Sequence, residues 1–398
     1  MRVAFTLIGG KAWTGGANYL HNLLSLCARY QPGRLTPVLF VSEDTAHEDY
    51  AKFEKIVGLE IVKTPVLNAP RQRASMLSAL FLGRDADMTA LFKTHGIDVV
   101  FESARFFGWR LGVPAVAWIP DMQHRKLPQF FSKASWIKRE IGFRLQILGG
   151  RRIMVSSHDA RVDCEEYYPA TKGRIGVVRF AIPPIEAIDL KAANELAASY
   201  NLPHDFFFMP NQFWRHKNHL RVIEALTILR QRGKRPVIAA SGMQLDPRDP
   251  THVPKVVKAI EDNGLADQFR LLGMIPYAHL AQLMLASAAV INASLSEGWS
   301  TTVEEAKSLG KKLLVSSLKV HHEQLEDAGI FFDPLSPAAI ADAIEQFTPP
   351  GDEAKLEAFR AASIAADQRA LDCAKSFCDF LENACRGQLG SIERNEHA

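Results

Sequence analysis

The sequence predicts an α/β protein built from two doubly wound domains, each with a parallel sheet. Three observations support this: short apolar runs alternate with helical stretches, a proline pair interrupts the alternation near the middle of the chain, and a second alternating series follows. Short runs rich in Val and Ile are typical of strands buried on both faces. Strands that alternate with helices favour parallel sheets with right-handed crossovers.

The first series spans the N-terminal half of the chain. We expect strands at 3–8, 37–41, 97–101, 115–119, 153–156 and 175–179, and a helix over 18–30. The pattern stops at Pro183 and Pro184, whose fixed φ angles favour extended backbone and a linker. The first domain is therefore expected to cover 1–182.

The second series has a similar length. We expect strands at 206–209, 236–240, 269–272, 289–292, 312–315 and 330–332, and helices at 220–230, 279–286, 303–309 and 337–347. The second domain is therefore expected to cover 183–370. The remaining residues, 371–398, are expected to form a helical tail, for which packing back onto the first domain is one option.

The composition limits the classes of function. A net charge of +3 over 398 residues is too small to indicate a nucleic-acid partner. The five cysteines, an odd number without a Cys-x-x-Cys pair, favour free thiols in a reducing compartment over disulfides or a zinc site. The first residues lack a signal-peptide pattern, and no apolar run reaches the length of a membrane span. We therefore expect a cytoplasmic protein.

The stretch 292–310 carries the strongest chemical signal. A buried strand runs into a polar turn with Glu297 and Gly298, and a helix follows that is expected to start at Thr301 or Thr302 with a capping box. In doubly wound folds, ligands bind at such strand–loop–helix junctions. The positive end of the helix suits a diphosphate.

We therefore expect a diphosphate to bind along the turn and the helix start. The residues in question are Gly298, Trp299, Ser300, Thr301 and Thr302. Glycine allows the backbone to approach the ligand closely.

Glu297 and Glu305 are a candidate pair of hydroxyl acceptors. Glu297 lies in the turn, and Glu305 lies roughly one helical turn inside the helix, about 5 Å further along its axis. At that offset one carboxylate could bind a sugar ring and the other a ribose. The alternative is a capping box followed by a solvated acidic first turn.

These residues resemble a known family. Glu297-x7-Glu305 followed by Gly310 resembles the E-x7-E signature of family 4 glycosyltransferases, which are retaining enzymes of the GT-B fold. The downstream run LLVSSLKVHHEQLEDAGIFFDP, with Glu323 at a recurrent glutamate position, and the upstream run FRLLGMIPYAHLAQLMLASAAVINAS are also similar to that family.

The resemblance implies a fold and a mechanism. It implies two Rossmann-like domains facing across a cleft and transfer with retention through a front-side, oxocarbenium-like path. The leaving phosphate helps to deprotonate the acceptor, so no protein nucleophile is expected. We expect no metal and no cofactor, since the protein supplies positive charge and no Asp-x-Asp clamp occurs.

A basic loop at 210–220 is the second candidate site. Lys217 would lie just before a helix, where it could neutralise a departing diphosphate. The alternative is a basic surface loop. The family has an arginine five residues before this lysine, but Gln212 stands here, so Arg215 is the candidate to supply that charge.

Two glycines after the first strand form a third candidate. Gly15 and Gly16 match the family's Gly-Gly turn over the donor diphosphate. Glycine suits such a close approach, and the alternative is a tight turn alone. The spacing is not G-x-G-x-x-G, so a dinucleotide site is weakly indicated.

Other strand ends supply further candidates. Asp121 and His124 follow a buried strand, where many family members carry a His-Asp pair, and we expect them to contact the transferring sugar or the acceptor. The alternative for His124 is a structural histidine. Ser241 and Gly242 could meet the base or a phosphate.

The stretch 136–148 is amphipathic and basic. It could rest on the inner membrane beside a lipid-linked acceptor. The alternative is an ordinary surface helix of the first domain.

Together these features predict a retaining glycosyltransferase. It would move a hexose-type sugar from a UDP- or GDP-sugar to a saccharide or lipid-linked acceptor, in cell-surface polysaccharide or lipopolysaccharide synthesis. Alternatives are a nucleotide-sugar epimerase or phosphorylase on the same scaffold, a dinucleotide oxidoreductase, and a binding protein with a decayed site. The presence of Glu297, Glu305 and Lys217 argues against a decayed site. Two departures from the family argue mildly for one: Gln212 in place of the arginine, and Pro120 in place of the histidine of the His-Asp pair.

Overall fold

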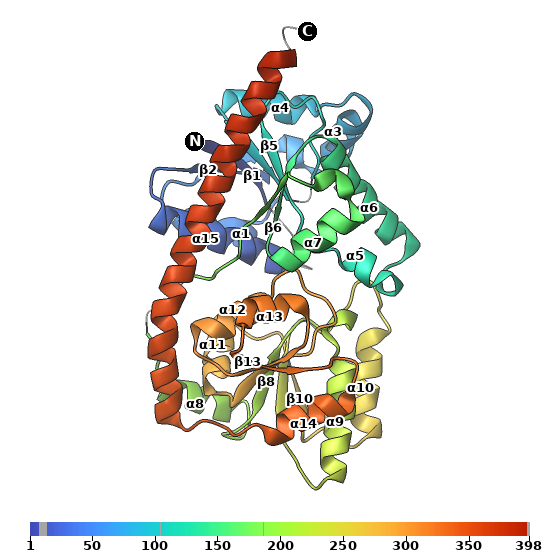
Figure 1. The fold of residues 1–398 in the computed structure, drawn as a ribbon, viewed down its shortest axis with the longest axis vertical. Helices are drawn as coiled ribbons and strands as arrows, with labels where there is room; N and C mark the ends of the chain where they lie inside the picture. Colours follow the sequence, from blue (N-terminus) through green and yellow to red (C-terminus); the bar gives the residue numbers. More distant parts are fainter. Residues whose placement is uncertain (8–13, 104, 186, 396–398) are drawn as a thin grey trace. The chain divides into compact units, whose positions relative to one another are not determined.

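The computed structural model describes residues 1–7, 14–103, 105–185 and 187–395. The chain divides into two compact units (Figure 1). The first comprises Met1–Met122, Lys133–Pro183 and Arg369–Ala398, and the second comprises Gln123–Ser132 and Pro184–Gln368. The main change of unit falls next to the proline pair. The inclusion of Gln123–Ser132 in the second unit was not predicted.

The first unit contains a seven-stranded parallel sheet in the order β3-β2-β1-β4-β5-β6-β7. Its strands are β1 (Arg2–Thr6), β2 (Thr36–Ser42), β3 (Glu60–Thr64), β4 (Val99–Glu102), β5 (Ala115–Trp118), β6 (Arg152–Val155) and β7 (Ile175–Val177). Its helices are α1 (Thr14–Tyr30), α2 (His47–Tyr50), α3 (Ala69–Phe81), α4 (Ala86–Thr94), α6 (Lys133–Leu148) and α7 (His158–Tyr167), with short 3-10 turns η1 (Ala51–Lys55), η2 (Pro65–Leu67) and η4 (Pro169–Thr171).

Strand β3 is the one strand of the described residues that the sequence did not predict. It lies at the edge of the sheet, and most of its residues are only partly buried. Its sequence, EIVKT, mixes charged and apolar residues because one edge faces water, so it lacks the continuous apolar run of the central strands. The expected end of the first strand, Ile8, lies outside the described residues.

The second unit contains a six-stranded parallel sheet in the order β10-β9-β8-β11-β12-β13. Its strands are β8 (Phe207–Pro210), β9 (Ile238–Ser241), β10 (Phe269–Gly273), β11 (Ala289–Asn292), β12 (Leu313–Ser316) and β13 (Gly329–Phe332). Its helices are α5 (Gln123–Lys126), α8 (Leu190–Ser199), α9 (His219–Gln231), α10 (His252–Asp262), α11 (Tyr277–Ala286), α12 (Thr301–Ser308), α13 (Lys319–Leu325) and α14 (Pro337–Gln346), with 3-10 turns η3 (Pro128–Phe130) and η5 (Arg215–Lys217).

Central strands of the second sheet are buried on both faces. Along β8, Phe207 and Met209 join one core cluster with side chains of α9, α10 and α14, while Phe208 joins another with α8, α11 and α12. This alternation is the two-residue period of a strand covered by helices on both sides. It explains why the continuous apolar runs predicted these strands to within two residues at each end.

The strand order reverses at the centre of the second sheet. From β8 the chain moves outward through β9 to β10, then returns to β11 on the other side of β8 and continues outward to β13. The loops that leave the carboxyl ends of β8 and β11 therefore depart in opposite directions and open a crevice. In doubly wound folds such a crevice is the place where ligands bind.

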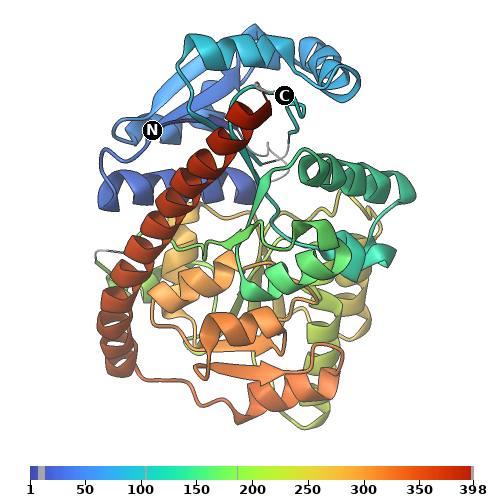
Figure 2. The same ribbon diagram turned by 45° about the horizontal axis from the view of Figure 1, so that its top comes forward.

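The long C-terminal helix α15 (Asp352–Asn395), red in Figure 2, has residues in both units, with the change between Gln368 and Arg369. Its part in the first unit contacts β4 and the turn before β2: the Phe377 ring lies 5.6 Å from that of Phe101, and Asp379 pairs with Arg34 at 2.7 Å. The described helices include none that is long and apolar enough to cross a membrane.

We predict that two glycine-to-alanine substitutions in the second unit differ in their effect on stability. Gly310 and Gly233 both have positive φ angles, 66° and 75°, but a methyl group at Gly310 would collide with the Ala358 carbonyl, whereas Gly233 faces open space. Gly233→Ala should lower the free energy of unfolding by about 1 kcal/mol. Gly310→Ala should lower it by a further ~1–3 kcal/mol because of overpacking.

Urea denaturation followed by tryptophan fluorescence measures both changes. Equal losses in the two variants would show that the contact between Gly310 and α15 does not constrain the fold.

Candidate active site in the second unit

Two loops meet where the strand order reverses. The loop after β8 carries Lys217 in η5, which ends at Asn218 in the left-handed conformation, with φ 68°. The Asn218 side chain donates a hydrogen bond to the Pro334 carbonyl at 2.8 Å. The loop after β11 is attached to this basic loop by a hydrogen bond from the Leu295 amide to the His216 carbonyl at 2.8 Å.

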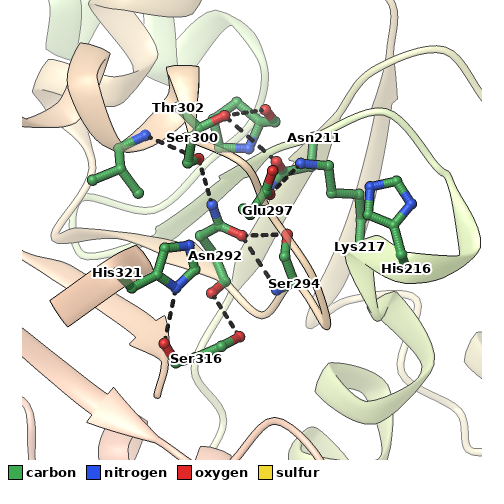
Figure 3. A network of polar contacts seen from close by, with 12 residues as sticks. Asn211, His216, Lys217, Asn292, Ser294, Glu297, Ser300, Thr302, Ser316 and His321 are labelled. Carbon is green, nitrogen blue, oxygen red and sulfur yellow. Dashed lines mark hydrogen bonds and ion pairs between the residues drawn. The ribbon is translucent and has the colours of Figure 1, made fainter. Parts of the chain in front are cut away.

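An ion pair joins the two loops. Lys217 Nζ donates to Glu297 Oε1 at 2.5 Å, and the two side chains are only 15% and 11% exposed (Figure 3). Side chains 80 positions apart in the sequence thus meet, as we expected for Lys217 and Glu297; their roles toward a ligand stay predictions. Limited water around the pair strengthens the attraction and would also strengthen the binding of another anion to the ammonium.

A buried polar network holds the loop that carries Glu297 (Figure 3). Asn292, the last residue of β11, donates through Nδ2 to Ser300 Oγ at 2.8 Å and accepts from Ser294 Oγ at 2.6 Å. Buried polar groups with satisfied hydrogen bonds restrict a loop to one conformation. The network therefore fixes Glu297 and the start of α12 relative to each other.

Helix α12 begins at Thr301, but the expected capping boxes are wrong. Ser300 is the N-cap residue and accepts from the Val303 amide at 3.4 Å, so the third helical position is a valine and cannot complete a capping box. Glu304 instead accepts from the Gln324 amide group at 2.9 Å. Thr302 is buried and donates to the Pro210 carbonyl at 3.3 Å.

Glu305 occupies a different environment from Glu297. Its carboxylate accepts a long hydrogen bond, 3.5 Å, from the hydroxyl of Tyr277, whose side chain is mostly exposed. Burial raises the pKa of Glu305 to about 7, and the Tyr277 hydrogen bond opposes that effect. The two carboxylates therefore have separate partners, which suits contacts with two different hydroxyl groups.

The side chain of Arg215 is directed toward another acid. Its guanidinium lies 3.7 Å from Asp249 and 4.7 Å from the centre of the Phe130 ring. Gln212, at the position of the family arginine, accepts from the Met243 amide at 2.8 Å. Arg215 can therefore supply the charge of the family arginine, which Gln212 replaces, only if its side chain moves away from Asp249.

Arg248 is a cation that the sequence analysis missed. It contacts the His216 ring nitrogen at 3.2 Å, pairs with Asp246 at 3.3 Å and lies over the Trp214 ring at 5.1 Å. The available signal was its position in the loop after β9, at the same sheet edge as Lys217. Its contact with Gln123, 2.7 Å, ties it to the short segment Gln123–Ser132.

Two predicted residues, Asp121 and His124, belong to different units. Asp121 lies in the first and pairs with Arg139 at 2.8 Å. His124 lies in the second, is fully buried and contacts the Phe131 ring edge-on at 6.4 Å. Their roles toward a sugar or an acceptor stay predictions.

The loops after β8 and β9 approach closely at Gly242. A side chain there would collide with the Asn211 carbonyl, and its φ angle of 149° also favours glycine. Beside it, Ser241 Oγ and Asn211 Nδ2 are buried and have no hydrogen-bond partner among the described residues. Unsatisfied buried polar groups are unfavourable unless a ligand or water completes them, which is consistent with the predicted ligand contact of Ser241 and Gly242.

His321 is a second residue that the sequence analysis missed as a site residue. Its ring is fully buried beside Asn292, and Nδ1 lies 2.8 Å from the Ser316 carbonyl (Figure 3). A carbonyl accepts only, so Nδ1 carries the proton and Nε2 presents a lone pair, for which no partner occurs among the described residues. Burial lowers the pKa of His321 and keeps the ring neutral. The only sequence feature that could have indicated this role was the adjacent pair His321 and His322 within the run that resembles the family.

The glycine pair of the first unit lies elsewhere than expected. Gly15 and Gly16 occupy the first turn of α1 and do not form a turn before it. The preceding residues 8–13 lie outside the described chain. No cluster of three or more His, Cys, Asp or Glu side chains suited to a metal ion occurs in the described parts.

Comparison with solved structures identifies the fold. HepE from Anabaena in complex with UDP and glucose matches with a TM-score of 0.69 and 15% identity over 96% of this chain and 100% of that one. A glycosyltransferase from Rickettsia africae matches with a TM-score of 0.67 and 15% identity over 96% of this chain and 97% of that one. Sucrose-phosphate synthase from Thermosynechococcus elongatus matches with a TM-score of 0.62 and 14% identity over 100% of this chain and 99% of that one. The chain therefore has the GT-B fold, as the sequence predicted.

A match to a family model indicates the class of chemistry. Residues 196–359, which include both loops of the site, match the family model described as Glycosyl transferases group 1. No curated protein sequence matches the chain. The family match and the fold together support glycosyl transfer.

The raised pKa of Glu305 predicts a pH-dependent stability difference. Between pH 4.5, the ordinary value, and about 7, the folded protein holds a proton that the unfolded chain has released, so stability falls as pH rises through this window. Glu305→Gln removes the penalty. It should be more stable than the wild type at pH 8 by on the order of 1 kcal/mol, since each pKa unit is worth about 1.4 kcal/mol and solvent reaches part of the side chain.

Urea denaturation at pH 4.5 and pH 8 tests this, with the exposed Glu195→Gln as the matched control. The same pH dependence in wild type and Glu305→Gln would mean that Glu305 titrates normally.

Proposed function

We propose that the protein is a retaining glycosyltransferase that moves a hexose-type sugar from a UDP- or GDP-sugar to a saccharide or lipid-linked acceptor. The ion pair between Lys217 and Glu297, next to the start of α12, is the observation that carries this proposal. It combines a cation for a diphosphate with a carboxylate for sugar hydroxyls at the edge of the sheet where such folds bind ligands.

The diphosphate would take the place of Glu297 as the partner of Lys217. A diphosphate carries more negative charge than one carboxylate, so exchange is electrostatically favourable. The positive end of α12, from Ser300 to Thr302, adds to the attraction. Arg248 lies near the same loop and would neutralise charge that develops as the diphosphate departs.

The released carboxylate of Glu297 would then orient hydroxyl groups of the sugar, while Glu305 would hold the ribose. The neutral His321 would accept a hydrogen bond from another sugar hydroxyl through Nε2, which satisfies an otherwise costly buried lone pair. Asp121 and His124 are proposed to contact the transferring sugar or the acceptor.

In the proposed reaction the bond between C1 of the sugar and the phosphate oxygen breaks while the acceptor oxygen attacks C1 from the same face. The acceptor proton passes to the departing phosphate, so charge and atoms balance without a protein nucleophile. The protein supplies positioning and electrostatic stabilisation without a metal ion.

Solved complexes of proteins with a similar structure support the choice of a nucleotide-sugar donor. HepE has been seen with UDP-glucose, and an E. coli protein of the same fold with UDP-2-fluoro glucose. We extend this to a UDP- or GDP-sugar donor for this chain, and to a cytoplasmic role in the synthesis of cell-surface polysaccharide or lipopolysaccharide.

A thermal-shift panel tests the proposal. Nucleoside diphosphates and nucleotide sugars are added to the full chain with and without EDTA, and a ligand of the folded state raises the melting temperature. We expect a shift with one base that EDTA does not alter. Isomerised donor in the absence of acceptor would favour an epimerase, and binding without any turnover would favour a decayed site.

Lys217→Met should lower kcat/KM for transfer by about 10²–10³-fold, as expected for loss of a group that stabilises the leaving charge. It should also weaken nucleoside diphosphate binding far more than nucleoside binding. The exposed Lys191→Met is the control and should change neither. Wild-type turnover in Lys217→Met would disprove the site.

His321 offers a separate prediction. His321→Phe keeps the shape of the ring but removes the acceptor, and should reduce kcat/KM by about 10-fold or more because a sugar hydroxyl loses its partner. His321→Gln can replace the acceptor and should restore part of the activity. Equal activity of the two variants, measured with folded protein, would limit His321 to a packing role.

A further inference from the structure

Half of the strongly exposed large apolar side chains among the described residues lie at three places in the first unit: the end of α3, Trp109 and α6. They are between 42% and 81% exposed and are Met76, Leu77, Phe81, Leu82, Trp109, Ile137, Ile141 and Leu148. Contiguous exposed apolar surface is unusual on a soluble domain and marks an interaction site.

Helix α6 carries apolar side chains on its exposed face as well as on its buried face. Its outer stripe follows helical spacing and consists of Lys133, Ile137, Ile141, Arg144 and Leu148. Its buried face combines Phe143 and Ile147, which join a core cluster, with the polar Glu140 and Gln146. Glu140 is satisfied there by the Tyr168 hydroxyl at 2.7 Å and by Arg144 at 2.6 Å. The core therefore does not account for the isoleucines outside.

The end of α3 is connected to the end of α6 by aromatic rings. A side chain at Gly83, just after Phe81 and Leu82, would run into the Trp109 ring. Trp109 lies 6.0 Å from Phe106, and a side chain at Gly149, which follows α6, would lie 3.1 Å from the Phe106 ring. These contacts place Trp109 and Phe106 between the end of α3 and the end of α6. We call the eight exposed residues together the apolar strip.

Positive charge flanks the apolar strip. The exposed basic residues on or beside it are Arg71, Arg73, Arg84, Arg110, Lys133, Lys138 and Arg144. Two acids pair with members of this set: Asp87 with Arg71 at 3.2 Å, and the buried Glu140 with Arg144. The strip thus combines apolar side chains with an excess of cations.

We propose that the apolar strip binds the surface of an anionic phospholipid bilayer. Side chains such as Phe81, Leu82 and Leu148 would enter the boundary between headgroups and acyl chains, while the arginines and lysines contact lipid phosphates. The long basic side chains can reach the headgroups while their stems stay on apolar surface. A second copy of the chain is a poorer partner, because its strip carries the same positive charge.

This inference extends the sequence-based expectation for 136–148 to the end of α3 and to Trp109, which the sequence did not single out. It does not depend on the identity of the donor. If the proposed function holds, membrane contact would bring the first unit to a lipid-linked acceptor.

Co-sedimentation of the full chain with vesicles tests the proposal. We expect binding to vesicles of phosphatidylcholine with phosphatidylglycerol, at least 10-fold weaker binding to pure phosphatidylcholine, and release by high salt. The pairs Phe81→Ser with Leu82→Ser, and Ile137→Ser with Ile141→Ser, should each weaken binding about 10-fold or more.

The matched controls are Val57→Ser and Ile364→Ser, which remove side chains 84% and 79% exposed outside the strip. They should bind as the wild type does. Melting temperatures and nucleotide-induced thermal shifts should be unchanged in all variants, which separates this test from that of the proposed function.

Three results would overturn the proposal: no binding to anionic vesicles, the same loss of binding in the control variants, or a dimer by light scattering that the strip variants abolish while vesicles remain unbound. The last result would identify the strip as a contact between copies of this chain.

Discussion

The contact between Lys217 and Glu297 is the interaction on which the proposed chemistry depends. It exists because the strand order reverses between β8 and β11 in the second sheet, so that loops from neighbouring strands, far apart in sequence, border the same crevice. The pair is mostly shielded from water, and a charge freed by exchange of its partner would have to be met by a ligand. In the proposed function the pair is therefore a preformed receptor for one anionic and one hydroxyl-bearing group.

The surroundings of this pair are built for rigidity. The hydrogen bond between Asn292 and Ser300 holds the loop of Glu297 against the start of α12. Gly242 lets the loops after β8 and β9 approach each other closely. Several buried polar atoms nearby, on Asn211, Ser241 and His321, have no partner among the described residues. Preorganised donors and acceptors of this kind need little rearrangement when a polar ligand arrives.

The sequence predicted what depends on local pattern and missed what depends on tertiary contact. Central strands were found because burial on both faces makes them continuously apolar, whereas the exposed edge strand β3 was not. Lys217 and Glu297 were predicted because each follows a strand and each matches a position of the resembled family's motifs. Arg248 and His321 were not, since their relevance arises only from neighbours distant in sequence, and the side-chain direction of Arg215 toward Asp249 had no sequence signal.

A crystal structure of the full chain with the nucleoside diphosphate selected by the thermal-shift panel tests the central claim most directly. The account predicts a phosphate oxygen within hydrogen-bond distance of Lys217 Nζ and separation of Lys217 from Glu297 beyond ion-pair distance. A diphosphate bound elsewhere, with the 2.5 Å contact between Lys217 and Glu297 intact, would contradict it.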